Sequence, residues 1–142
     1  MTNSFSNYMK MGKVKKQTPN PNEAQALFEK AKLLLLYAED KKANEKTAAF
    51  ILEDAYEAMR EAAQSLMSLN GFKPYSHEAT VSFIQAFYSS IFTEEDIALF
   101  DHFRQVRNNS VYSAFHVSIE DANDCIIFAH KFIKKIEQFR KS

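Results

Sequence analysis

The chain contains very few residues that interrupt a helix. Only two glycines and three prolines occur among its 142 residues. Hairpins and tight turns therefore lack the residues that they need, whereas helices need few breakers. The composition predicts an all-α fold, and a chain of this length with 46% apolar residues suits one domain around one core of ordinary size.

Helix-start signals divide the chain into segments that carry apolar stripes at helical spacing. Asn20-Pro21-Asn22-Glu23 supplies a capping side chain, a first-turn proline and a carboxylate at the positive helix end, so we expect a helix over residues 20–40. A long helix follows over residues 45–69, and Asn70-Gly71 ends it because glycine accepts the left-handed conformation beyond a helix end. Ser76 then caps a shorter third helix.

Two capping boxes mark the remaining helices. Thr93-Glu94-Glu95-Asp96 opens a fourth helix, which should weaken at Asn108-Asn109-Ser110 before a loop to Val117. Ser118-Ile119-Glu120-Asp121 opens a last helix that runs to about Phe139. Short connections favour antiparallel neighbours, so we expect an antiparallel up-and-down four-helix bundle with a shorter fifth helix, the third along the chain.

Residues 1–19 precede this bundle and show no sustained hydrophobic period. They mix Ser, Asn and Thr with four lysines, which are Lys10, Lys13, Lys15 and Lys16. We expect a flexible basic N-terminal arm here, followed by the helical domain over residues 20–142. Two interpretations stay open, because the arm is either a solvated tail without a function or a segment that contacts phosphate or a partner.

Composition and spacing exclude several classes of protein. Eighteen basic and eighteen acidic residues balance, so no overall field attracts a nucleic acid or a membrane, and such a partner would need a local patch. With Gly12 and Gly71 as the only glycines, the chain has no glycine-rich phosphate loop. Neither the single cysteine nor the four histidines have metal-ligand spacing, so we expect no cofactor and no metal.

The cysteine content and the apolar stretches of the sequence indicate where in the cell the protein is located. Cys125 is the only cysteine, so it makes no internal disulfide, and its place on an apolar helix face predicts a buried, unreactive thiol. The longest apolar stretch, Leu33 to Ala38, is far too short to span a bilayer, and the polar N-terminus has no signal-peptide core. We expect a cytoplasmic protein with no membrane partner.

Polar residues with recognisable chemistry gather at the end of the fourth expected helix. Arg104 and Arg107 lie one turn apart, and their planar guanidinium groups suit a phosphate or a carboxylate. Asn108, and then Tyr112 and His116 in the following loop, could complete a polar cleft. Alternatively, the two arginines only pair with acids of a neighbouring helix, and Tyr112 packs the loop.

Several segments resemble the HEPN family of small helical bundles. They are the alanine-rich helix from Tyr56 to Leu69, the turn over residues 70–78, the stretch from Phe103 to Tyr112 with its Arg-Asn pair, and the capped final helix from Ser118. The resemblance implies a helical bundle that is frequently a homodimer and is often encoded beside a small nucleotidyltransferase as a toxin and antitoxin pair. Active members of the family are described as metal-independent ribonucleases.

The resemblance also implies a ribonuclease motif, from which this chain departs. The motif is an arginine, usually followed by a polar residue such as asparagine, and then a histidine several positions later. Arg107 and Asn108 match the first two elements, but Tyr112 falls in the window where the histidine belongs, and His116 comes too late. Cleaving RNA through its 2′-hydroxyl needs a base and an acid of near-neutral pKa and a cation for the developing charge. Tyr112 is a poor base at neutral pH, although it can still hydrogen-bond a phosphate.

Three hypotheses follow for the function. In the first, which we favour, a HEPN-like domain with a degenerate ribonuclease motif binds a nucleotide, RNA or a nucleotidyltransferase partner through Arg104, Arg107, Asn108 and Tyr112. In the second, the chain is an active metal-independent ribonuclease toxin that uses Arg107 with Tyr112 or His116 as catalytic residues. In the third, it is a non-catalytic helical scaffold or adaptor whose polar residues are only structural.

Aromatic residues bear on the oligomeric state. The chain has thirteen phenylalanines, and such a surplus favours an interface between two copies. Four aromatics of the third helix region, Phe83, Phe87, Tyr88 and Phe92, are the candidates, although phenylalanines at helical spacing also suit a core. Because HEPN proteins are also frequently homodimers, we expect this protein to form a homodimer.

Overall fold

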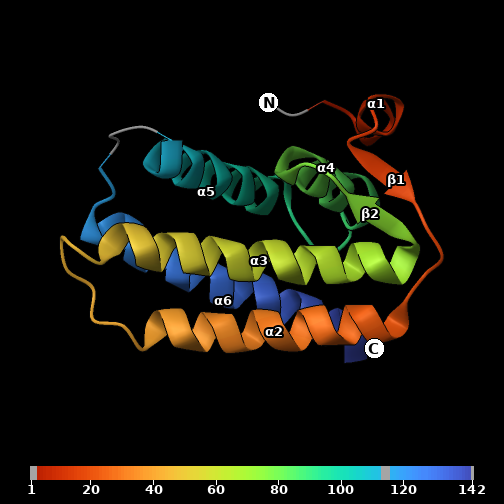
Figure 1. The fold of residues 1–142 in the computed structure, drawn as a ribbon. Coiled ribbons are helices and arrows are strands. Elements are labelled where there is room, and N and C mark those ends of the chain that lie inside the picture. Colours follow the sequence, from red (N-terminus) through yellow and green to blue (C-terminus); the bar gives the residue numbers. More distant parts are fainter. Residues whose placement is uncertain (1–2, 113–115, 142) are drawn as a thin grey trace.

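The computed structural model describes residues 3–112 and 116–141, except for the side chains of Val111, Tyr112 and Lys141. Within this part of the chain there are six helices and one two-stranded sheet (Figure 1). In chain order they are α1 Phe5–Lys10, β1 Val14–Lys16, α2 Pro21–Glu39, α3 Ala48–Asn70, β2 Phe72–Pro74, α4 His77–Phe87, α5 Glu94–Tyr112 and α6 Ile119–Lys141. The predicted all-α class is confirmed.

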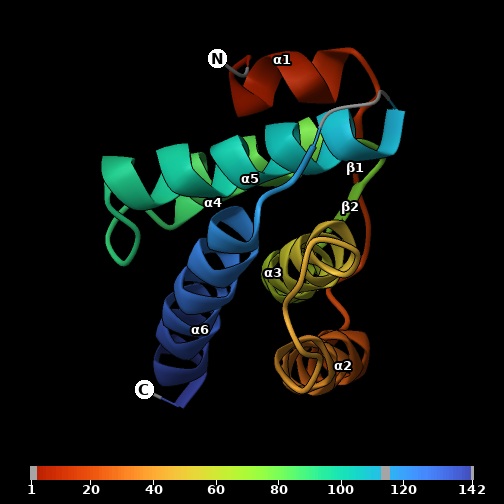
Figure 2. The same ribbon diagram turned by 90° about the vertical axis from the view of Figure 1, so that its left-hand side faces the viewer.

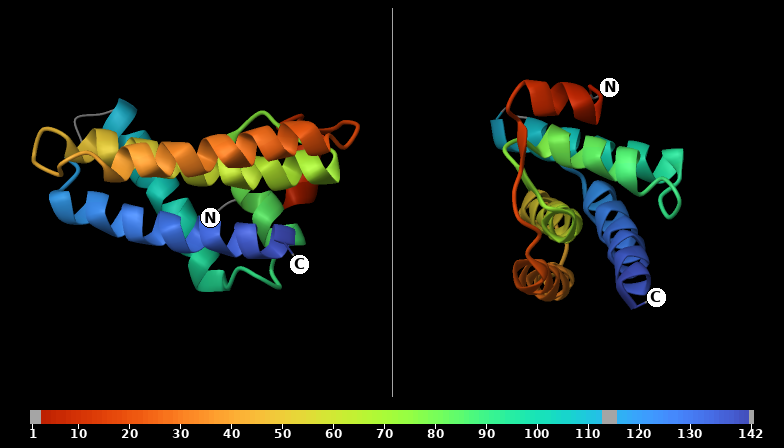
Figure 3. Two further views of the ribbon diagram at one scale, coloured as in Figure 1. Left: turned by 90° about the horizontal axis from the view of Figure 1, so that it is seen from below. Right: turned by 90° about the vertical axis from the view of Figure 1, so that its right-hand side faces the viewer.

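Three long helices lie alongside one another. α2 and α3 run antiparallel and pack most extensively, and α6 lies beside both (Figures 1 and 3). α4 and α5 cover another side of α3, and α5 crosses α3 obliquely instead of following it (Figure 2). The long helices α2, α3, α5 and α6 alternate in direction, but the oblique α5 makes the arrangement less regular than the expected up-and-down bundle.

Local capping explains where most helices begin and end. The Asn20 side chain accepts a hydrogen bond from the Glu23 backbone N–H at 3.0 Å, and Pro21 opens α2. Both expected capping boxes form, one at the start of α5 and one at the start of α6. Gly71 ends α3 with a left-handed backbone, φ 78°, as the sequence predicts.

Gly71 also forms a hydrogen bond between the N-terminal segment and the bundle. Its carbonyl accepts a hydrogen bond from the Gln17 N–H at 2.9 Å. A Cβ at this position would lie only 2.6 Å from the Gln17 carbonyl oxygen. The close approach and the positive φ therefore both require glycine here.

The basic N-terminal segment is folded against the domain, which corrects the expectation of a flexible arm over residues 1–19. Residues 5–10 form α1, and β1 pairs antiparallel with β2, with Lys15 opposite Lys73. Tyr8 is 4% exposed and Val14 is 1% exposed. Sequence periodicity missed these elements because they are too short to show a period and because distant residues hold them in place.

α5 continues further than the asparagine-rich sequence predicts. The expected break at residues 108–110 is absent, and the helix runs without interruption to Tyr112. Asparagine disfavours a helix by less than about 1 kcal/mol, which tertiary packing readily overrides. Arg104, Arg107 and Asn108 therefore project from one continuous helix.

The core uses most of the aromatic residues. Phe92 and Phe100 pack on Phe132, with ring centroids 4.6 and 4.7 Å apart. Phe83 and Tyr88 are buried as well, whereas Phe87 is 49% exposed. Of the four aromatics proposed for a dimer interface, three are thus core residues, and Phe87 stacks on Phe83 with about half of its surface left exposed.

Two further expectations concern Cys125 and the membrane. Cys125 is fully buried, so its predicted burial is confirmed, and burial raises the pKa of its thiol. Among the described residues, no helix combines the length and the apolar character that crossing a bilayer requires.

Candidate polar site between α3, α4 and α5

Polar side chains from three helices meet where α4 and α5 cover α3. The Tyr56 hydroxyl of α3 lies 3.3 Å from His77 Nδ1 of α4, and Arg104 Nη1 of α5 lies 3.9 Å from a carboxylate oxygen of Glu78. The charges of Arg104 and Arg107 also act on both Tyr56 and His77. We call this group the polar cluster, and its members are Tyr56, Glu57, Arg60, His77, Arg104 and Arg107.

The start of α4 places the histidine of the cluster. Ser76 caps the helix, since its hydroxyl accepts a hydrogen bond from the Ala79 N–H at 3.1 Å. His77 is consequently the first residue of α4, and its ring lies 5.8 Å from the ring of buried Tyr56, measured between centroids.

Two of the three arginines of the cluster are paired with carboxylates. Arg60 forms an ion pair with Glu57 and donates a further hydrogen bond to Gln64 at 2.9 Å. Arg104 donates from Nε to Asp101 at 2.7 Å, in addition to its contact with Glu78. The alternative in which arginines pair with acids therefore applies to Arg104, which contacts one acid on its own helix and one on α4.

The third arginine of the cluster, Arg107, differs from the other two in its charge partners. It is half-buried, its only hydrogen bond to a described residue goes from Nη1 to the neighbouring Asn108 side chain at 3.2 Å, and no described carboxylate forms an ion pair with it. Its Nε is buried and has no hydrogen-bond partner among the described residues. A buried donor without a partner is unfavourable, and no described carboxylate forms an ion pair with this guanidinium, so the position suits an external anion.

Two other buried polar atoms lack partners among the described residues. One is an oxygen of Glu61, whose other oxygen pairs with Lys30 at 3.1 Å. The other is Arg140 Nη1, but the Arg140 guanidinium donates to Gln25 and lies over the ring of Phe28, 5.2 Å from its centroid. Both groups therefore have packing or charge partners outside the polar cluster.

The surroundings of His77 favour the neutral form of its imidazole over the charged form. Burial lowers its pKa, and the charges of Arg60, Arg107 and Arg104 lower it further against the opposing charge of Glu57. Burial raises the pKa of the Tyr56 phenol, which therefore stays protonated. With Nδ1 directed at Tyr56, the Nε2 atom of His77 remains available to a ligand.

His77 and its neighbours line a polar pocket of about 360 Å³. The polar pocket is lined by Arg60, Gln64, Tyr75, Ser76, His77 and Thr80, together with Pro74. Sequence reasoning missed His77 because only the packing of α4 on α3 brings it to the arginines. The one local signal is its place directly after the capping serine.

The residues predicted from the sequence are only partly brought together. Arg104 and Arg107 belong to the polar cluster, and the Asn108 side chain accepts a hydrogen bond from Arg107. The Tyr112 side chain lies outside the described part of the chain. His116 is exposed in the segment between α5 and α6, and no hydrogen bond or ion pair joins it to a described residue of the cluster. Within the described ranges, no three His, Cys, Asp or Glu side chains are grouped so that they could hold a metal ion.

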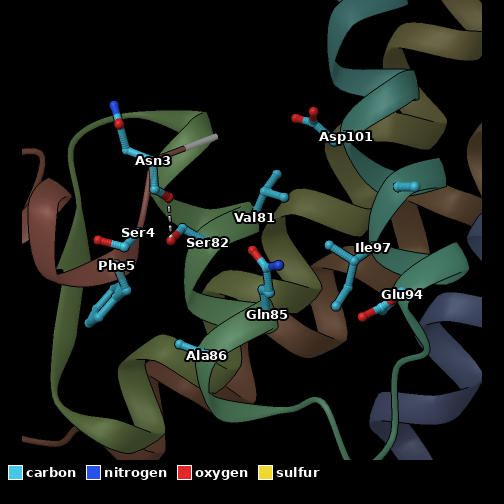
Figure 4. Close-up of a pocket in the computed structure, with 11 residues that line it drawn as sticks. Asn3, Ser4, Phe5, Val81, Ser82, Gln85, Ala86, Glu94, Ile97 and Asp101 are labelled. Atoms are coloured by element: carbon cyan, nitrogen blue, oxygen red, sulfur yellow. Dashed lines mark hydrogen bonds between the residues drawn. The ribbon is translucent and has the colours of Figure 1, made fainter. Parts of the chain in front are cut away.

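A larger hollow of about 750 Å³ lies between α1, α4 and α5 (Figure 4). Apolar Val81 and Ile97 line it together with the carboxylates of Glu94 and Asp101, and no Lys, Arg or His is among its lining residues. The negative charges make this hollow unsuitable for a phosphate. The polar pocket is the better candidate for an anionic ligand.

Comparison with known families identifies the domain. The model of the HEPN domain matches residues 24–139. The chain belongs to the HEPN domain family. HEPN domains are generally associated with nucleotide- and RNA-related roles. No curated protein matches the chain.

Proposed function

We propose that this HEPN domain binds the phosphate of RNA or of a nucleotide at the polar cluster, with Arg107 as the principal phosphate-binding residue. The observation that carries the proposal is the half-buried Arg107 guanidinium, which has no carboxylate partner among the described residues. A guanidinium binds two phosphate oxygens at once through its planar array of donors. Asn108, Arg104 and Tyr112 would add further hydrogen bonds.

Partners of the domain fit the same proposal. HEPN domains often form dimers, and in a homodimer two Arg107 sites facing each other would make one basic groove. A small nucleotidyltransferase partner would present its nucleotide to the same residues. The proposal places the protein in the cytoplasm, where RNA and nucleotides occur.

Fluorescence anisotropy with labelled single-stranded RNA, and separately with labelled ATP, tests the binding proposal. Because a charge-assisted hydrogen bond contributes about 1.5–3 kcal/mol, Arg107→Ala should weaken binding about 10- to 100-fold. Arg140→Ala is the matched control, since it removes another partly unpartnered arginine that lies outside the cluster. An Arg107→Ala protein that folds normally and binds both ligands as tightly as the parent would support the scaffold hypothesis instead.

His77 supports a second candidate function, which is metal-independent cleavage of RNA. In this reaction Nε2 of His77 takes the proton of the 2′-hydroxyl, and the 2′ oxygen forms a bond to phosphorus as the bond to the 5′ oxygen breaks. His77 then returns the proton to the departing 5′ oxygen. The products are a 2′,3′-cyclic phosphate and a 5′-hydroxyl, and Arg107 stabilises the charge that develops on the phosphorane.

Incubation with RNA in the presence of a chelator tests this second function. Cleavage by the parent protein should disappear in His77→Gln and Arg107→Ala and persist in His116→Gln. If cleavage instead depends on His116 and not on His77, the assignment of the base is wrong. Intact RNA after incubation with the parent leaves the domain as a binding module.

A further inference from the structure

The two-stranded sheet presents a concentrated basic surface. Lys13, Lys15 and Lys16 come from β1 and the residue before it, and Lys73 comes from β2. All four side chains are exposed, and none forms an ion pair with another described residue. Residues 11–17 and 72–76 contain no aspartate or glutamate. In a chain whose overall charge is balanced, this surface is the kind of local patch that an anionic polymer needs.

Tyr75 adds an aromatic ring to this surface. Its side chain is 53% exposed, and the Nζ atoms of Lys15 and Lys73 lie 5.3 and 5.7 Å from the centroid of its ring. Exposed aromatic rings among basic side chains are how proteins hold single-stranded nucleic acid, because bases stack on the rings while cations contact the backbone. We call Lys13, Lys15, Lys16, Lys73 and Tyr75 the basic ribbon.

The ribbon is held on the domain and is not a loose tail. The Tyr75 N–H donates to the Lys13 carbonyl at 2.7 Å, and the Gln17 N–H donates to the Gly71 carbonyl at 2.9 Å. Val14, on the face of β1 opposite to Lys13 and Lys15, is buried in the core, and Lys16 at the end of the strand is exposed. The lysines are therefore presented from a fixed backbone, which lowers the entropy cost of binding.

The ribbon adjoins the part of the polar cluster that lines the polar pocket, which does not include Arg107. Tyr75 and His77 line the same polar pocket, together with Arg60. A strand that places one nucleotide in the polar pocket would have its next nucleotides beside Tyr75 and the lysines. This adjacency favours RNA over an anionic membrane, which would use the lysines but would need neither the stacking ring nor the pocket.

We propose that the basic ribbon binds single-stranded RNA, with phosphates on the four lysines and a base stacked on Tyr75, and delivers the strand to the polar cluster. The proposal rests on the function proposed above, because the cluster is taken to bind the phosphate of the same strand. It also assigns a role to the basic N-terminal segment of the sequence.

The first experiment compares a uridine oligomer with a uridine dinucleotide, which is long enough only for the polar cluster. Lys13→Gln, Lys15→Gln and Lys16→Gln together should weaken oligomer binding at least about 10-fold and leave dinucleotide binding unchanged. Each phosphate contact to a single strand contributes about 0.7 to the slope of log K against log salt, so the slope should fall by about 2.

A matched triple variant controls for the lost charge. Lys42, Lys46 and Lys134 are exposed, form no ion pair with a described residue, and lie away from the ribbon, the first two at the far end of α2 and α3 (Figure 1). Replacing all three by Gln should leave oligomer affinity unchanged. Equal losses in both triple variants would overturn the proposal, because they would show a dependence on overall charge alone.

Tyr75 tests the stacking step. Tyr75→Ala should weaken oligomer binding by about 5- to 100-fold, whereas Tyr75→Phe should keep it, because phenylalanine preserves the ring. Double-stranded RNA should bind more weakly than the oligomer, since its bases are already stacked. Unchanged binding in Tyr75→Ala would overturn the assignment of the ring.

The outcomes separate this proposal from the function on which it rests. If Arg107→Ala loses the dinucleotide while the triple ribbon variant keeps the oligomer, the ribbon proposal fails and the binding function stands. If Arg107→Ala keeps the dinucleotide, the proposed function itself fails. Binding to phosphatidylserine vesicles that the ribbon variant abolishes, with oligomer affinity unchanged, would make the ribbon a membrane surface and overturn the proposal.

Discussion

Asp96 at the start of α5 and Arg107 near its end are both charged groups in contact with the interior, yet their surroundings are opposite. The Asp96 side chain is only 3% exposed, and it accepts hydrogen bonds from Lys135 at 2.6 Å and from the Thr93 backbone N–H at 3.0 Å, with Lys131 at 3.2 Å. Among the described residues, Arg107 has one hydrogen bond, to its neighbour Asn108, and no ion pair with a carboxylate.

This difference indicates that the charge of Asp96 stabilises the fold, whereas the charge of Arg107 is available to bind a ligand. Every interaction of Asp96 serves the start of α5 and its packing on α6, so its replacement should act on stability. Arg107 has a buried donor without a hydrogen-bond partner among the described residues, so its replacement should act on binding. The predictions below test this contrast, beginning with the largest effect.

Asp96→Ala should lower the free energy of unfolding by about 3 kcal/mol, because it removes a capping box and two ion-paired hydrogen bonds from a buried site. Asp121→Ala is the matched control, since Asp121 closes the equivalent capping box at α6 and has no lysine ion pair among the described residues. It should lose only about 1 kcal/mol. Urea unfolding measures both values, and equal losses would show that the lysine pairs add nothing.

The pH dependence of stability should report the same carboxylate. Burial alone would raise the pKa of Asp96, but the hydrogen bonds from Lys135, Thr93 and Lys131 lower it to about 2. A group whose pKa falls on folding stabilises the native state above its unfolded pKa. About 2 kcal/mol should therefore be lost as pH falls from about 4 to about 2. Urea midpoints against pH measure this loss, and the slope in this range should flatten in Asp96→Asn; an unchanged slope would exclude Asp96 as its source.

Arg107→Met should change stability in the opposite direction or not at all. Replacing a half-buried charge that has no ion pair among the described residues by an apolar side chain of similar length is expected to leave the free energy of unfolding unchanged or to raise it by about 1 kcal/mol. The same variant should bind RNA as weakly as Arg107→Ala. A loss of stability close to that of Asp96→Ala would show that Arg107 is structural and would remove the contrast.

The smallest expected effect is on the titration of His77. Its pKa should lie below the ordinary range of histidine and rise in Arg60→Gln, since Arg60 contributes the largest charge effect that lowers it. Because folding depresses this pKa, His77 should stabilise the fold above the unfolded pKa and lose that contribution as pH falls below it. NMR titration of the His77 ring measures the shift, and the same titration in Arg140→Gln is the control.

Local sequence patterns predict the helical frame well. The cap at Asn20, the left-handed Gly71 and the capping box at Thr93 each depend on residues within one turn, and each has the expected geometry. The positions of Arg104 and Arg107 on one helix follow from the same short-range rules. Such interactions can be read from the sequence because both partners are adjacent in it.

The parts that the sequence does not predict depend on residues far apart in the chain. The pairing of β1 with β2 joins residues 14–16 to residues 72–74, and neither strand is long enough to show a period. His77 meets Tyr56 only because α4 packs on α3. The N-terminal lysines form a surface beside Tyr75 only because β1 is paired.

The sequence by itself determined the all-α class, most of the helix starts and stops, the HEPN resemblance and the departure at Tyr112, because composition, spacing and caps are local properties. The tertiary structure decided which charges are neutralised, and that depends on burial and on the neighbours that packing supplies. In the folded chain Arg107 has no carboxylate partner among the described residues, and His77 of α4 lies near the arginines of α3 and α5. The N-terminal lysines belong to a folded surface beside the site.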